Sequence, residues 1–218
     1  GVAIAEYVMA QVLSVTHPIA EQRAMQAAKE WKTTPFREIS RMTWLIVGFG
    51  PIGREVAKRT KAFGAKNIVI RRSPSLSETV DEAGTLEDIA SHLPKADVIL
   101  FACPLNDQTR NLADAGFFSA VKKDAILVNI ARGGVVDDAA LIAALDEGRL
   151  ETAILDVFTQ EPLPEESALW SHPKVRMTSH TSFAGDGVQA RWDTLFLDNI
   201  ARYVKGEPLM SEVDPKDI

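Results

Sequence analysis

The sequence predicts an α/β fold with a doubly wound parallel sheet of the Rossmann type. Two observations lead to this prediction. The segment Gly-Phe-Gly-Pro-Ile-Gly at residues 48–53 lies between a short apolar run and a stretch with helical spacing. Further short apolar runs then alternate with helical or turn segments, which is typical of a parallel sheet covered on both faces.

The expected elements begin with two helices, over residues 3–16 and 19–31. They meet at His17-Pro18, because proline is tolerated in the first turn of a helix but not in its middle. Strands are expected at residues 44–47, 67–70, 97–102, 125–130, 152–156 and 175–178, and further helices at 54–63, 138–147 and 186–204. Asp137 is a suitable N-cap, and Gly148 stands where a glycine ends a helix.

Composition narrows the classes of function. The chain has 218 residues, 46% of them hydrophobic, and a net charge of -6 without a basic stripe, which argues against a nucleic-acid partner. Cys103 is the single cysteine, so no intrachain disulfide can form and a reducing compartment is favoured. Residues 1–15 are apolar but contain Glu6 and are too short to cross a bilayer. We therefore expect a cytoplasmic protein with no membrane partner.

The glycine-rich loop predicts binding of a dinucleotide. Gly48 suits a tight turn, Gly50 allows the backbone to approach a pyrophosphate, and Gly53 allows close packing of helix on strand. The helix that starts with Pro51 and Ile52 directs its positive dipole end at the phosphates.

An arginine pair follows the second predicted strand, where a carboxylate for a ribose 2′-hydroxyl is usual. Arg71, Arg72 and the adjacent hydroxyl of Ser73 suit a 2′-phosphate, so the sequence favours NADP over NAD. A pair of solvated arginines is the alternative, and it leaves NAD open.

Four polar residues follow strands at the edge of the sheet where ligands bind. They are Arg132, Asp156, Glu161 and His180. Taken singly, each could be a surface charge or a structural side chain. Their shared place at the carboxyl ends of parallel strands predicts a common site.

With these residues in place, the chain resembles the D-isomer-specific 2-hydroxyacid dehydrogenases, the group that contains glyoxylate, hydroxypyruvate and phosphoglycerate dehydrogenases. The matching motifs occur in the same order along nearly the whole chain; they lie at residues 5–10, 48–53, 96–109, 128–137, 155–163 and 179–180.

The resemblance implies a hydride transfer between NADP(H) or NAD(H) and a small D-2-hydroxy acid or 2-oxo acid. Arg132 would hold the substrate carboxylate, and His180 would exchange a proton with the carbonyl oxygen. Glu161 would orient His180 and favour its protonated form, and Asp156 would accept a hydrogen bond from the nicotinamide carboxamide. Further residues that the resemblance places along the cofactor are Cys103, Pro104, Thr109, Ile130 and Ala131. Cys103 is expected to be a packing residue rather than a nucleophile, and no metal is expected.

The resemblance also implies a domain organisation. The chain begins at a helix that in the family follows an N-terminal substrate lobe, so we expect that lobe to be absent. Residues 1–31 would be helices between the lobes, residues 32–185 the dinucleotide-binding domain, and residues 186–218 a C-terminal helix and tail that return toward the substrate lobe. A homodimer is implied by the family alone.

There are two alternative functions, and one of them stays open. A non-catalytic dinucleotide sensor is open, because corepressor relatives of the family resemble the enzymes at Arg132, Glu161 and His180. A formate dehydrogenase is disfavoured, because such sites have glutamine where this chain has Glu161. Ser179, where proline is frequent, and the bulkier residues 181–183 leave the shape of the substrate pocket open.

Overall fold

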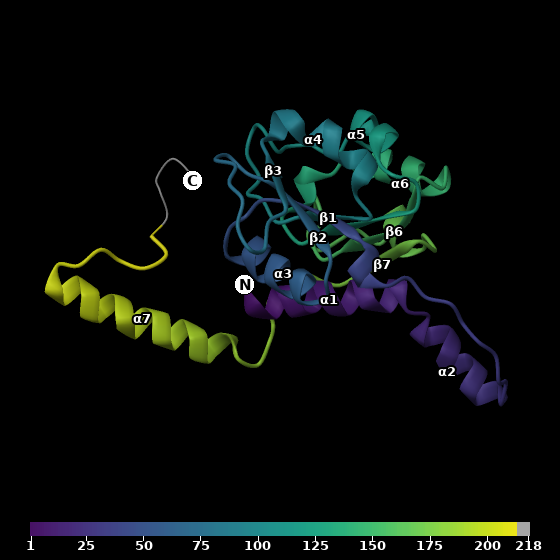
Figure 1. The fold of residues 1–218 in the computed structure, drawn as a ribbon, viewed down its shortest axis with the longest axis horizontal. Helices are drawn as coiled ribbons and strands as arrows, with labels where there is room; N and C mark the ends of the chain where they lie inside the picture. The colour runs from purple at the N-terminus through teal and green to yellow at the C-terminus, as the bar shows by residue number, and fades with distance from the viewer. Residues whose placement is uncertain (213–218) are drawn as a thin grey trace. The chain divides into compact units, whose positions relative to one another are not determined.

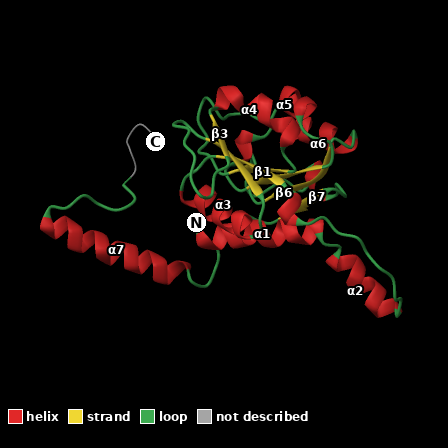
Figure 2. Cartoon of the chain, viewed as in Figure 1, coloured by secondary structure: helices red, strands yellow, loops and turns green. Residues whose placement is uncertain are grey.

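A seven-stranded parallel sheet forms the centre of the fold, with strand order β3-β2-β1-β4-β5-β6-β7 (Figures 1 and 2). The computed structural model describes residues 1–212. The strands are β1 (Thr43–Val47), β2 (Lys66–Ile70), β3 (Glu82–Gly84), β4 (Val98–Phe101), β5 (Ala125–Asn129), β6 (Leu150–Leu155) and β7 (Val175–Met177). The strand order reverses direction at β1, so the predicted doubly wound sheet is confirmed.

Helices cover both faces of the sheet. They are α1 (Val2–Thr16), α2 (Ile19–Ala28), α3 (Pro51–Ala62), α4 (Ile89–His92), α5 (Ala115–Ala120), α6 (Asp138–Asp146) and α7 (Val188–Lys205). Figure 1 shows α4, α5 and α6 over one face, and α1 and α3 over the other. Short 3-10 turns lie at Ile39–Arg41, Leu86–Asp88, Leu93–Lys95, Gly133–Val135 and Ala168–Trp170.

The strands are apolar because both of their faces are buried. In β1, Trp44 and Ile46 join the hydrophobic cluster under α1 and α3, whereas Leu45 and Val47 join the cluster under α4, α5 and α6. Successive side chains of a strand point to opposite faces, so most positions of a strand between two helical layers favour apolar residues.

The element ends follow local chemistry. The second helix ends at Ala28, three residues before the predicted end, because Lys29 adopts a left-handed conformation with φ 56°. Asp137 caps α6 by accepting from the amides of Ala139 and Ala140, as predicted. The edge strand β3 was not predicted, since Glu82-Ala83-Gly84 has neither the length nor the apolar pattern of a buried strand.

The chain divides into two compact units, Gly1–Ser182 and Phe183–Ile218. The first contains the sheet together with α1, whose Val8 and Val12 have no exposed surface. The second contains α7, which ends at Gly206 with φ 69°. The three-part division at residues 31 and 185 stays a prediction, and residues 213–218 of its last part lie outside the described residues.

Among the described helices, none has by itself the length and apolar composition of a membrane span. Helices α1 and α2 have this length and composition only when they are taken together, and this pair is bent by 54°.

Candidate active site

The glycine-rich loop connects β1 to α3, and its geometry explains two of the three glycines by packing. A Cβ at Gly48, where φ is +97°, would lie 2.5 Å from the carbonyl oxygen of Ala102. A Cβ at Gly53 would lie 2.3 Å from the carbonyl oxygen of Gly48. Both distances are far below van der Waals contact, so larger residues would push β1, β4 and α3 apart.

Gly50 differs, because a Cβ there would meet no atom within 4 Å. Protein packing therefore does not require glycine at this position, and the space beside its backbone is open. Gly50 is the N-cap of α3 and Pro51 its first residue, so the unpaired amides of the helix start face this space. The loop thus fits a dinucleotide pyrophosphate, which needs close backbone approach at a helix N-terminus.

A cavity of about 470 Å³ lies beyond the carboxyl ends of β4 and β5. Its lining is formed by Ile52, Ala102, Cys103, Pro104, Leu105, Ile130, Ala131 and Arg132. Because β4 lies beside β1, where the strand order reverses, this is the place where doubly wound sheets bind ligands. Five residues predicted to contact the cofactor therefore share one cavity with Arg132.

Thr109 is buried in the loop that follows Pro104. It is 4% exposed, and its hydroxyl donates to the carbonyl oxygen of Pro104 at 2.7 Å. The amide of Asn106 donates back to the same hydroxyl at 2.9 Å. In this structure, Thr109 holds the loop of Pro104, while its contact with a cofactor stays a prediction.

The thiol of Cys103 is buried, and burial raises its pKa to about 11, although a backbone hydrogen bond acts in the opposite direction. We expect iodoacetamide to alkylate it at near-neutral pH about a hundredfold more slowly than an unfolded cysteine, because the thiolate is the reactive form. Mass spectrometry over a time course measures the rate, and the same protein in denaturant is the control. Equal rates in the two conditions would contradict a packing role.

The arginine pair begins where β2 ends. The guanidinium of Arg71 lies 5.6 Å from the ring centre of Phe49, a residue of the glycine-rich loop, and donates to the hydroxyl of Ser75 at 3.2 Å. Arg71 is thereby placed beside the predicted phosphate site. Arg72 and Ser73 are exposed on the same loop.

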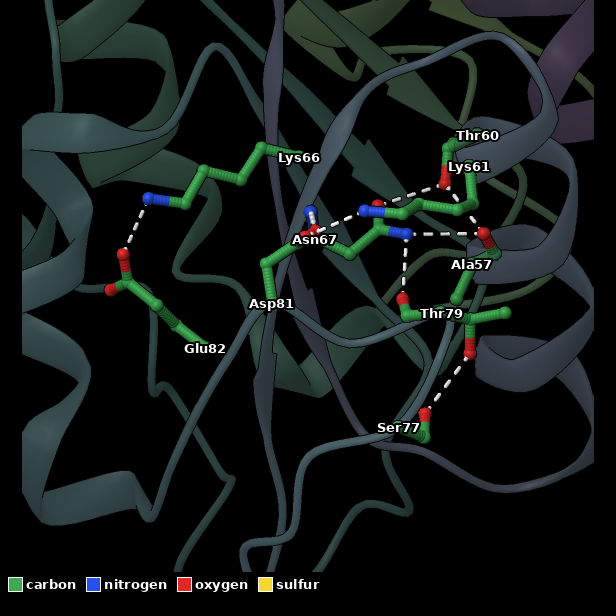
Figure 3. A network of polar contacts seen from close by, with 9 residues as sticks. All are labelled: Ala57, Thr60, Lys61, Lys66, Asn67, Ser77, Thr79, Asp81 and Glu82. Carbon is green, nitrogen blue, oxygen red and sulfur yellow. Dashed lines mark hydrogen bonds and ion pairs between the residues drawn. The ribbon is translucent and has the colours of Figure 1, made fainter.

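A buried polar network anchors the far end of this loop (Figure 3). Asn67 of β2 has no exposed surface, and its amide nitrogen donates to the carbonyl oxygens of Ala57 on α3 at 3.0 Å and of Thr79 at 2.9 Å. Its amide oxygen accepts from the hydroxyl of Thr60 at 2.8 Å. Asn67 therefore ties the arginine loop to the helix that starts at the glycines. Asn67 was not predicted to support the site, although a lone asparagine in an apolar strand is a visible signal in the sequence.

Glu161 and His180 form a direct pair. The distance from Nδ1 of His180 to Oε2 of Glu161 is 2.7 Å, and the amide of Phe158 donates to Oε1 at 2.9 Å. Burial acts to raise the pKa of Glu161, but the hydrogen bonds from His180 and Phe158 outweigh it, so this pKa lies below its ordinary value. Since an ionised carboxylate can only accept, Nδ1 of His180 carries the shared proton.

Asp156 lies at the end of β6 and has no exposed surface. Its Oδ1 accepts from the Thr178 hydroxyl at 2.6 Å and from the Thr181 amide at 2.8 Å, and its Oδ2 accepts from the Ser182 amide at 3.0 Å. These donors flank His180 on both sides. The structure thus gives Asp156 partners within the chain, whereas its predicted contact with a nicotinamide stays untested.

Arg132 follows β5, and its guanidinium donates to the carbonyl oxygen of Ala131 at 2.7 Å. Asn129, which is 1% exposed, shapes this turn by donating to the carbonyl oxygen of Arg132 at 3.0 Å and accepting from the amide of Ala131 at 3.1 Å. Asn129 is a second positioning residue that the sequence analysis did not single out.

Gly133 connects the Arg132 turn to the segment that carries Glu161. A Cβ at Gly133 would lie 1.9 Å from the carbonyl carbon of Phe158, so the two backbones are in direct contact. The Arg132 turn therefore contacts the segment whose Glu161 pairs with His180, and all four predicted residues follow the carboxyl ends of β5, β6 and β7. Of the four, Arg132 lines the cavity.

Comparison with known proteins gives consistent matches. The family model described as "D-isomer specific 2-hydroxyacid dehydrogenase, NAD binding domain" matches residues 9–182. Glyoxylate/hydroxypyruvate reductase A of Salmonella choleraesuis (strain SC-B67) is 33% identical over an alignment of 218 positions, which covers 98% of this chain and 68% of that protein.

Two similar crystal structures contain a nicotinamide cofactor. The D-isomer specific 2-hydroxyacid dehydrogenase from Xanthobacter autotrophicus Py2, in complex with NADPH and MES, has a TM-score of 0.85 and 31% identity, and the match covers 98% of this chain and 88% of that one. The NADPH-dependent glyoxylate/hydroxypyruvate reductase from Sinorhizobium meliloti, in complex with NADP and sulfate, has a TM-score of 0.86 and 29% identity, with 99% and 69% covered.

Proposed function

The chain belongs to the D-isomer-specific 2-hydroxyacid dehydrogenases, and on this premise we propose that it reduces glyoxylate, hydroxypyruvate or a similarly small 2-oxo acid with NADPH. Its general activity is that of the family, an oxidoreductase that transfers a hydride between a nicotinamide dinucleotide and a 2-oxo acid or 2-hydroxy acid. The observation that carries the proposal is the 2.7 Å pair of His180 and Glu161 at the edge of the sheet that also carries Arg132.

The reduced nicotinamide supplies the hydride for the carbonyl carbon when it is bound. His180 gives the proton from Nε2 to the carbonyl oxygen, and Glu161 holds the Nδ1 side of the ring during this transfer. Arg132 pairs with the substrate carboxylate and so orients the carbonyl. With the hydride from the bound cofactor, this proton would convert the 2-oxo acid into the 2-hydroxy acid, and in the reverse direction His180 would accept the proton.

Cofactor preference is proposed to come from Arg71, Arg72 and Ser73. We expect the double variant Arg71→Ala, Arg72→Ala to lose affinity for NADPH by about tenfold or more, because a charge-assisted hydrogen bond to the 2′-phosphate is worth about 1.5 to 3 kcal/mol. Calorimetric titration measures the affinity, and NADH, which has no 2′-phosphate, is the internal control. Tighter binding of NADH than NADPH by the unaltered protein would contradict the proposal, as would an unchanged ratio in the double variant.

The activity is tested by following NADPH oxidation by the full-length protein with a panel of small 2-oxo acids. Oxidation that depends on the 2-oxo acid supports the proposed reaction. Tight NADPH binding without turnover of any member of the panel would instead favour the dinucleotide sensor. A homodimer in the cytoplasm, without nucleic-acid or membrane partners, completes the proposal and rests on the family resemblance and the composition.

A further inference from the structure

The backbone of His180 adopts an unusual conformation that its surroundings must maintain. Its φ is +53°, in the left-handed region that non-glycine residues rarely occupy. Such a conformation costs free energy and persists only where neighbouring contacts hold it. The contacts on both sides of His180 in the chain therefore determine where its imidazole lies.

These contacts converge on the carboxylate of Asp156. The amides of Thr181 and Ser182, which follow His180, donate to its two oxygens at 2.8 and 3.0 Å. The hydroxyl of Thr178, two residues before His180, donates to Oδ1 at 2.6 Å. The buried side chain of Asp156 thus accepts hydrogen bonds from residues on both sides of His180.

The hydrogen bonds continue from Thr178 to helix α1. The hydroxyl of Tyr7 lies 2.7 Å from the hydroxyl oxygen of Thr178. Because Thr178 uses its single proton toward Asp156, it must accept the proton of Tyr7. Burial raises the pKa of Tyr7. The hydrogen bond to Thr178 lowers this pKa and the negative charge of Asp156 raises it, but burial has the largest effect. The phenol therefore keeps the proton that it donates to Thr178.

We propose that Tyr7 and Thr178 are positioning residues for the proton donor, acting through Asp156 on the turn that carries His180. The assignment rests on the proposed function, since it supposes that His180 transfers the proton. It gives Asp156 a role toward the turn that is separate from its predicted contact with the nicotinamide. It also makes α1 a part of the catalytic geometry, through Tyr7, which precedes Thr178 by 171 residues in the sequence.

The test uses near-isosteric substitutions in the full chain. Thr178→Val removes the hydroxyl at nearly constant shape and is expected to lower kcat for 2-oxo acid reduction about tenfold, as loss of one buried hydrogen bond allows. NADPH affinity should stay within about twofold, because the glycine-rich loop is untouched. Thr178→Ser restores the hydroxyl and should restore kcat, whereas a general packing defect would not follow this pattern.

A double-mutant cycle tests whether Tyr7 acts through Thr178. As a single substitution, Tyr7→Phe should lower kcat about threefold. In a protein that already carries Thr178→Val it should have no further effect, because the hydroxyl that accepts the proton of Tyr7 is gone. Tyr203→Phe, at the only other tyrosine of the chain, is the matched control and should not change kcat. Each kcat is expressed per NADPH-binding site, so that unfolded protein does not contribute.

The outcomes separate this inference from the proposed function. A normal kcat in Thr178→Val, or additive effects of Tyr7→Phe and Thr178→Val, would overturn the hydrogen-bond chain while a loss of activity in His180→Ala still supports the proposed reaction. If His180→Ala itself keeps normal kcat, both are overturned. Should Thr178→Val fail to fold, Tyr7→Phe alone decides, since a normal kcat there contradicts the inference.

Discussion

Replacing His180 by alanine is expected to lower kcat for 2-oxo acid reduction by about a hundredfold to ten-thousandfold, the usual contribution of a positioned general acid. The imidazole is the group proposed to donate the proton to the carbonyl oxygen, and Glu161 holds its Nδ1 at 2.7 Å. Without it, the developing negative charge on the carbonyl oxygen has no proton donor at that position. Steady-state NADPH oxidation gives kcat, and calorimetric titration gives NADPH affinity, which should change little.

His172 offers a matched control for this substitution. Its Nε2 lies 3.2 Å from Oδ1 of Asp146, so it is also an imidazole beside a carboxylate, but it precedes β7 and thus lies at the other edge of the sheet. His172→Ala should affect thermal stability at most, with kcat per NADPH-binding site unchanged. Similar kcat values for His180→Ala and the unaltered protein would remove His180 from the mechanism.

The main strands were predictable from the sequence because burial on both faces leaves a clear apolar run. Leu45 and Ile46 face opposite helical layers, and neither position tolerates a polar residue. The edge strand β3 lacks this signal, since it pairs only with β2 and contains Glu82. Its existence depends on the loop that Asn67 and Asp81 hold in place, which is a tertiary effect that no local pattern encodes.

The residues of the site could be predicted from the sequence, but the contacts between them could not. Strand ends and motif order identified Glu161 and His180, because the carboxyl ends of parallel strands lie on the same side of the sheet. The pair itself depends on the left-handed turn at His180, and the hydrogen bonds of Asp156 connect the residue after β6 to this turn after β7. The backbone contact of Gly133 with Phe158 likewise appears only when the loops are packed.

The substrate side of the site depends on Arg132. Removing its guanidinium in Arg132→Ala is expected to weaken capture of the 2-oxo acid by about 2 to 5 kcal/mol, because the substrate carboxylate would be left without its partner. This corresponds to a loss in kcat/KM of roughly thirtyfold to several thousandfold. The loss should appear mainly in the KM for the 2-oxo acid, while NADPH affinity, which depends on the glycine-rich loop, stays close to that of the unaltered protein.

Two further variants decide whether the effect belongs to the guanidinium or to charge alone. Arg132→Lys keeps the charge but loses the two-pronged geometry that matches a carboxylate, so it should recover only part of kcat/KM. Arg149→Ala removes the same charge from an exposed arginine that pairs with Glu147 just before β6, at the opposite edge of the sheet, and should leave kcat/KM unchanged. If Arg132→Ala binds and reduces 2-oxo acids as well as Arg149→Ala does, the carboxylate is held elsewhere. The Arg132 turn, shaped by Asn129 and Gly133, would then only line the cavity.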